Sequence, residues 1–174
     1  MKQTDFGMFF HSDTPKKIKY QVRFGANLLH DMTYLASYIH DSRFKIESIN
    51  HIKKRLVIPL ERDCWELDSE DEIKTAKSKL TFFPVEKFSF VISDIRIEKG
   101  LIKGHDDEDN IWISNMYLSD DYYTNEENFN VVLIDRSGFK LQVNITRANP
   151  LIKLEDLTIP AKWEERIKEN ENKK

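Results

Sequence analysis

One stretch of this chain has a clear helical periodicity, and the segments around it are patterned as strands. Between Asn27 and Asp41 the apolar residues recur every three to four positions, which places them on one stripe of a helix: Leu28, Leu29, Met32, Leu35, Ala36 and Ile39. A helix of this length is not stable alone in water, so the stripe must pack against another element. The sequence therefore predicts one amphipathic helix over about residues 27–41, lying on a sheet.

Alternation of apolar and polar residues predicts several strands. The clearest hairpin joins Val131–Ile134 to Phe139–Ile145 through a short turn ending at Gly138. Pro59 cannot donate a backbone hydrogen bond, so we expect the strand around it to be an edge strand or to be bulged there. Hairpin connections favour antiparallel pairing. The predicted fold class is α+β, strand-dominated, with a mainly antiparallel sheet and one main helix; a two-sheet sandwich is the variant.

Length and composition limit the organisation of the chain. Its 174 residues are 40% hydrophobic, which suits a single globular domain over residues 1–165, followed by a charged tail at 166–174. The lone Cys64 cannot form an internal disulfide and fits a reducing compartment. The segment Met1–Phe10 does not have a basic stretch before an apolar run, and no apolar run reaches the length of a membrane span. We therefore expect a cytoplasmic protein without a membrane-spanning segment.

Charge is distributed unevenly along the chain. The net charge of -3 argues against nucleic-acid binding. Residues 104–135 contain no Lys or Arg, and they carry nine acidic residues: Asp106, Asp107, Glu108, Asp109, Asp120, Asp121, Glu126, Glu127 and Asp135. The sequence predicts an acidic pole, which bears on the choice of partner rather than on the fold.

Aromatic residues are interspersed with these acids. Tyr and Trp side chains supply contact area at low entropic cost and are frequent at interfaces. Our main hypothesis is a non-enzymatic binding protein whose acidic, aromatic segment engages a basic protein partner. The expected binding residues are Asp106, Asp107, Glu108, Asp109, Tyr122 and Tyr123. The alternative is that some of these aromatic residues are core residues and others only cover a loop.

Three His-Asp dipeptides are the other places where chemistry could reside. His30 and His40 are about 15 Å apart along a helix, too far to share a metal ion. The acidic run after Gly104 does not match the spacing of an EF-hand, although a weak divalent-ion site there stays open. We therefore assign no catalytic residue, metal ligand or cofactor. Two alternatives remain: a metal-dependent hydrolase using His105 and Asp106 with a histidine supplied by the fold, and an oligomerising subunit that pairs through an edge near Pro59 or through Trp163.

Overall fold

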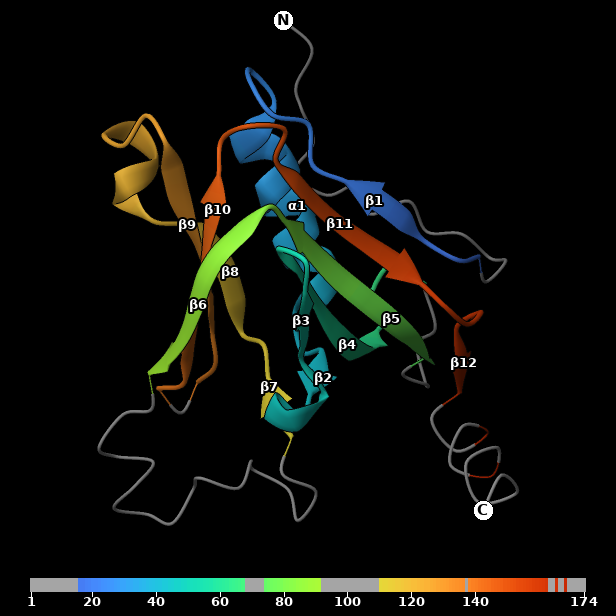
Figure 1. Ribbon diagram of the computed structural model, residues 1–174. Coiled ribbons are helices and arrows are strands. Elements are labelled where there is room, and N and C mark those ends of the chain that lie inside the picture. Colours follow the sequence, from blue (N-terminus) through green and yellow to red (C-terminus); the bar gives the residue numbers. More distant parts are fainter. Residues whose placement is uncertain are drawn as a thin grey trace, which may run out of the picture.

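Two antiparallel sheets and one α-helix make up the described part of the molecule (Figure 1). The computed structural model describes residues 16–67, 74–91, 110–136 and 138–162, together with residues 165 and 168. The predicted α+β class with dominant antiparallel strands is confirmed, and the two-sheet variant is the form observed. In these described ranges no helix is long and apolar enough to cross a membrane.

The larger sheet has eight strands, with the order β1-β11-β5-β4-β2-β7 and with β12 and β3 pairing to β5 and β4. Its strands are β1 Lys19–Gln21, β2 Arg43–Phe44, β3 Asn50–Ile52, β4 Arg55–Asp63, β5 Lys74–Phe83, β7 Ile111–Trp112, β11 Leu151–Asp156 and β12 Ala161–Lys162. The smaller sheet has the order β6-β10-β9-β8. Its strands are β6 Val85–Val91, β8 Asn115–Leu118, β9 Asn128–Ile134 and β10 Lys140–Thr146. Two short 3-10 turns complete the described elements, η1 Ile46–Ser48 and η2 Asp120–Tyr123.

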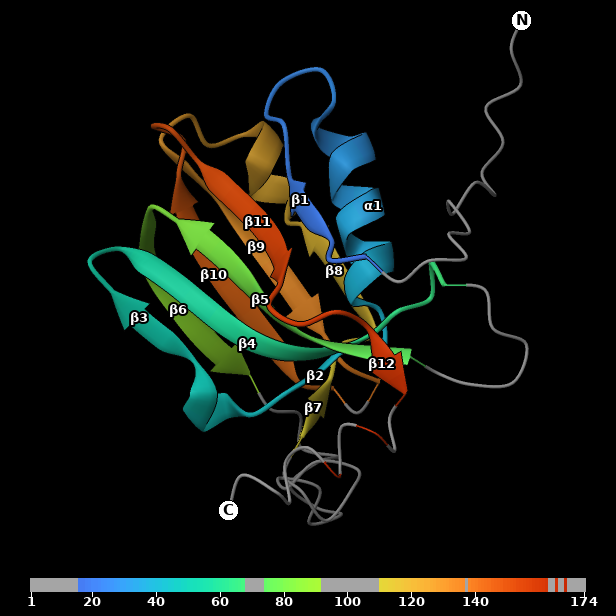
Figure 2. The same cartoon turned by 90° about the vertical axis from the view of Figure 1, so that its right-hand side faces the viewer.

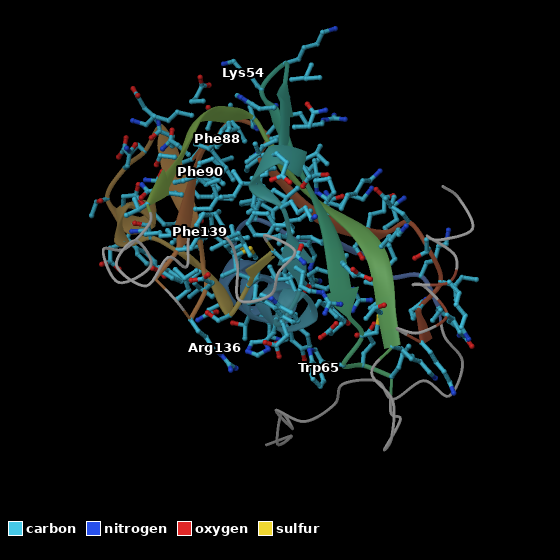
Figure 3. The ribbon with its side chains drawn as sticks, turned by 90° about the horizontal axis from the view of Figure 1, so that it is seen from below. Lys54, Trp65, Phe88, Phe90, Arg136 and Phe139 are labelled. Atoms are coloured by element: carbon cyan, nitrogen blue, oxygen red, sulfur yellow. The ribbon has the colours of Figure 1, made fainter. Side chains whose placement is uncertain are left out.

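The core lies between the inner faces of the two sheets, because alternate residues of each strand point the same way. On β4 these are Leu56, Ile58 and Leu60, and they share one buried cluster with Leu141 and Val143 of β10. Phenylalanines line the smaller sheet's side of this core: the rings of Phe88 and Phe90 lie 5.7 Å apart, as do those of Phe90 and Phe139 (Figure 3). The predicted β9–β10 hairpin is confirmed, with Ile134 opposite Lys140.

The predicted helix is α1, Leu28–Ile39, two residues shorter at its C-terminal end than 27–41. Its apolar stripe buries Leu28, Met32, Leu35 and Ile39, whereas Leu29, which was also predicted to lie on the stripe, is 58% exposed. The helix lies beside β1 and β8 (Figure 2). Asn27 stands at the N-cap but its side chain makes no capping bond. Asp31 is also fully buried, because it accepts hydrogen bonds from the backbone and side chain of Arg23.

Pro59 does not lie in an edge strand, and the register of β4 with β5 is continuous on both sides of it. The prediction of an edge strand or a bulge at Pro59 was therefore wrong. β4 lies inside the larger sheet, paired with β5 along its whole length. On its other side β3 pairs as far as Val57, and β2 pairs only at Glu61. Pro59 falls between these two partners, where no strand of the described chain needs its missing N–H group.

Candidate functional site

The connection between β8 and β9 holds the part of the acidic, aromatic segment that the structure describes. Its η2 turn contains Tyr122 and Tyr123, two of the residues expected to bind a partner. The other four, Asp106, Asp107, Glu108 and Asp109, lie outside the described residues, as does His105. We call residues 119–127 the β8–β9 connection.

The two tyrosines of this connection lie in different surroundings. The Tyr122 ring is half-buried, 5.3 Å from the ring of the fully buried Phe129. The Arg147 guanidinium lies over the Tyr122 ring at 4.3 Å, and the same group donates a hydrogen bond to the Tyr122 backbone carbonyl. Tyr123 meets the Tyr122 ring edge-on at 5.4 Å and is 68% exposed. Tyr122 therefore anchors the connection to the core, and Tyr123 is presented to solvent.

Side-chain amides and carboxylates fix the backbone of the connection. The Asn125 side-chain oxygen accepts hydrogen bonds from the backbone N–H groups of Glu127 (2.9 Å) and Asn128 (3.1 Å). The Asp121 carboxylate accepts a hydrogen bond from the Asn130 side-chain amide, whose oxygen in turn accepts one from Asn144 at 3.0 Å. These bonds tie the connection to β9 and β10, so its exposed side chains project from a fixed backbone.

Sequence reasoning missed these supporting residues. Asn is frequent in turns because its side chain can bond the backbone two residues ahead, so Asn125 did carry a signal for this turn. Arg147 gave no local signal, because it lies 25 residues along the chain from Tyr122.

The charge of the connection is acidic and largely uncompensated. Asp120, Glu126 and Glu127 are exposed, and none of them forms an ion pair with a described residue. Arg147 is the basic group that packs on this region, through the Tyr122 ring and through a hydrogen bond to the Asn125 carbonyl at 2.8 Å. A group of negative carboxylates around an exposed tyrosine would attract a cationic partner.

The described histidines do not converge on one site. His30 Nδ1 lies 3.6 Å from the Asp31 carboxylate, and His40 Nδ1 lies 2.9 Å from that of Asp41. His51 instead packs edge-on against the Phe88 ring at 5.4 Å. No group of three or more potential metal ligands occurs among the described residues. The histidine placement that the hydrolase hypothesis requires is therefore not provided by these three side chains.

A second charged cluster is internal. The guanidinium of Arg62 on β4 is completely buried and makes paired hydrogen bonds to Glu66 and Asp156, at 2.8–3.1 Å. Burial alone would lower the pKa of Arg62, but the hydrogen bonds that its guanidinium donates to the two carboxylates raise that pKa above its usual value. Ser78 donates a further hydrogen bond to Asp156 at 2.6 Å. With its polar groups paired internally, this cluster holds β4, β5 and β11 together.

Comparisons with protein-family models, curated proteins and solved structures found no significant match to this chain.

Proposed function

We propose that this protein is a non-enzymatic binding protein, and that its β8–β9 connection engages a basic protein partner. The observation that carries the proposal is the placement of Tyr123, 68% exposed, among the exposed carboxylates Asp120, Glu126 and Glu127. Tyrosine is among the side chains that contribute most to protein interfaces, and an exposed one in an acidic setting suits a cationic surface.

The rigidity of the connection supports this proposal. Association loses free energy whenever a loop or side chain must be ordered, at about 0.5–1.5 kcal/mol for each flexible side chain. Here the hydrogen bonds of Asn125 and Asp121 and the packing of Tyr122 on Phe129 already order the backbone. Tyr123 is thus presented in one place before a partner arrives.

The charges have a separate role. Exposed carboxylates add little affinity each, but together they accelerate the encounter with a positively charged protein, and salt weakens this effect. We expect Tyr123 to govern dissociation and the acids to govern association. Asp106, Asp107, Glu108 and Asp109, which belong to the same acidic segment of the sequence, are proposed to extend the surface.

The test compares two matched double variants with the wild-type protein. Tyr123→Ala with Glu126→Gln alters the proposed surface. Tyr34→Ala with Glu47→Gln makes the same chemical change on α1 and η1, where Tyr34 is 37% exposed and Glu47 is exposed. Partners retained by the immobilised wild-type chain from its native host are identified by mass spectrometry, purified, and measured by surface plasmon resonance at about 50 and 300 mM salt.

We expect a basic partner whose affinity falls at least tenfold for the first variant and is unchanged for the second. Its association rate should also depend less on salt for the first variant. Equal affinities for the wild type and the Tyr123 variant, at both salt concentrations, would show that this connection is not the binding surface.

A further inference from the structure

A cavity of about 410 Å³ lies away from the β8–β9 connection. It forms where the C-terminal end of α1, the β7–β8 link and the β9–β10 turn meet, and its lining residues are Asp41, Trp112, Ile113, Ser114, Asp135 and Arg136. Ser114 bonds to Ile134 at one end of the β8–β9 pair, whereas Ser119 of the connection bonds to Asn130 at the other. The labelled Arg136 marks the cavity's side of the molecule in Figure 3.

Backbone hydrogen bonds hold the walls of this cavity together. The Asp41 N–H donates to the Ile113 carbonyl, and the Ile113 N–H donates to the Ser42 carbonyl, each at 2.8 Å. The Ser114 N–H and hydroxyl both donate to the Ile134 carbonyl, at 2.8 and 3.0 Å. Three segments that are distant in sequence are thereby fixed to one another, so the cavity is formed before any ligand arrives.

The lining combines one apolar wall with charges of both signs. Trp112 is half-buried with the Arg43 guanidinium 4.6 Å from its ring, and Ile113 beside it is buried. The Asp41 carboxylate contacts His40 through one oxygen, Oδ2, at 2.9 Å. Asp135 is buried and adds a second carboxylate, whereas the Arg136 guanidinium is exposed and forms no ion pair with a described residue.

These charges select among ligand classes. Two carboxylates disfavour a phosphate or another simple anion, because like charges repel. A divalent cation is not favoured either, because the described residues contain no group of three or more potential metal ligands. A ligand with both an ammonium and a carboxylate group matches the opposite charges that Asp41 and Arg136 bring to the lining. The volume falls in the range of small-molecule sites, roughly 300–1,000 Å³.

We propose that this cavity binds a small zwitterion of the α-amino-acid class with a large apolar side chain. The ammonium group pairs with Asp41, the carboxylate pairs with Arg136, and the side chain lies against Trp112 and Ile113. This site is independent of the proposed protein-binding surface, since none of its residues belongs to the β8–β9 connection.

The first test uses the wild-type chain and three probes. L-phenylalanine is titrated to about 10 mM, a range set by the weak binding expected of so small a ligand, while the amide and indole N–H signals are followed by NMR. L-phenylalaninamide lacks the carboxylate, and N-acetyl-L-phenylalanine lacks the ammonium group. We expect saturable shifts at the Trp112 indole and at the Ile113 and Ser114 amides, with each derivative binding at least tenfold more weakly than the parent.

The second test assigns each charge to its residue. Asp41→Asn should weaken L-phenylalanine at least tenfold and leave N-acetyl-L-phenylalanine unaffected; Asn tolerates the positive φ of 59° at this position. Arg136→Gln should weaken L-phenylalanine and leave L-phenylalaninamide unaffected. Arg55→Gln is the control, because Arg55 is exposed at the far end of β4. It should leave the affinity for all three probes unchanged.

Two results would overturn the proposal. One is no shift at Trp112, Ile113 or Ser114 with L-phenylalanine, L-leucine or L-methionine. The other is that both derivatives bind as tightly as the parent amino acid, because the ligand's charges would then have no role. Loss of partner binding in the Tyr123 variant leaves the amino-acid titration unchanged, so the two proposals fail separately.

Discussion

Asp156 and Glu155 are neighbours on β11 whose carboxylates face opposite sides of the larger sheet, and they offer a matched test of burial. Asp156 accepts four hydrogen bonds, from Arg62 Nε (3.1 Å) and Nη2 (2.8 Å), Ser78 Oγ (2.6 Å) and the Ile18 N–H (2.8 Å). Glu155 lies within 4 Å of three lysine ammonium groups on the outer face, those of Lys19, Lys79 and Lys153.

Asp156→Ala should reduce the free energy of unfolding by about 3–5 kcal/mol, the usual result of removing one partner from a buried ion pair. The side chains of Arg62 and Asp156 are both 0% exposed, so water cannot replace the lost carboxylate. Glu66 still pairs with Arg62, which keeps the loss from being larger. Glu155→Ala should change the free energy of unfolding by only about 0–1 kcal/mol, since Glu155 is 24% exposed on the outer face of the sheet, where water and salt screen its ion pairs.

Urea unfolding followed by circular dichroism measures both variants, and thermal melting gives a second reading. The Asp156 variant should melt about 6–20 °C lower than the wild type, from the usual 2–4 °C per kcal/mol for a chain of this size. Added salt should diminish the effect of Glu155→Ala and leave that of Asp156→Ala unchanged. Unfolding free energies of the two variants within about 0.5 kcal/mol of each other would refute the argument from burial.

Two further substitutions and one labelling experiment test other parts of the structure. Burial raises the pKa of Asp63 to about 6, against the opposing effect of Arg43, so its ionisation destabilises the fold as pH rises from about 4 to 6. The free energy of unfolding of the Asp63→Asn variant should therefore exceed that of the wild type by about 1–3 kcal/mol near pH 7.5, and the two should be similar near pH 4. A wild type more stable than the variant at the higher pH would contradict this. Burial also raises the pKa of Cys64 to about 12, so a thiol reagent at neutral pH should label it only in denaturant, and rapid labelling of the folded chain would contradict its placement. Pro59→Ala should change the free energy of unfolding in urea by less than about 1 kcal/mol, since the new N–H faces the gap between β3 and β2. A larger loss of stability would contradict the placement of Pro59 in this gap.

Local periodicity predicted the helix and the best hairpin, because both depend on nearby residues. Leu28, Met32, Leu35 and Ile39 recur at helical spacing and are buried together. The alternation of Leu141, Val143 and Ile145 likewise identified the inner face of β10. Positions of this kind are determined within one turn of helix or one strand, so a sequence window contains the whole signal.

Long-range pairing was not accessible in the same way. Arg62 shares the inward-facing side of β4 with Leu56, Ile58 and Leu60, yet its partner Asp156 lies 94 residues away. Asp31 lies in the first turn of α1, and it accepts hydrogen bonds from Arg23, which lies before the helix. Polar residues like these are placed inside by a partner that no local window contains.

For the candidate surface, the sequence located the acidic and aromatic segment but could not distinguish Tyr122 from Tyr123. Adjacent residues of a short turn point in different directions, and which one faces inward depends on Phe129 and Arg147. The cavity at Asp41 was also not predicted, because its walls come from three separate segments.

The Arg62 cluster also has a consequence for the order in which the chain can fold during synthesis. Arg62 and Glu66 leave the ribosome long before Asp156, and β1, at residues 19–21, pairs with β11 at residues 153–155. Until residue 156 has emerged, the nascent chain holds a cation without its second carboxylate and an early strand without its partner. Completion of the larger sheet must therefore follow translation of β11, and the earlier segments remain available to chaperones for most of that interval.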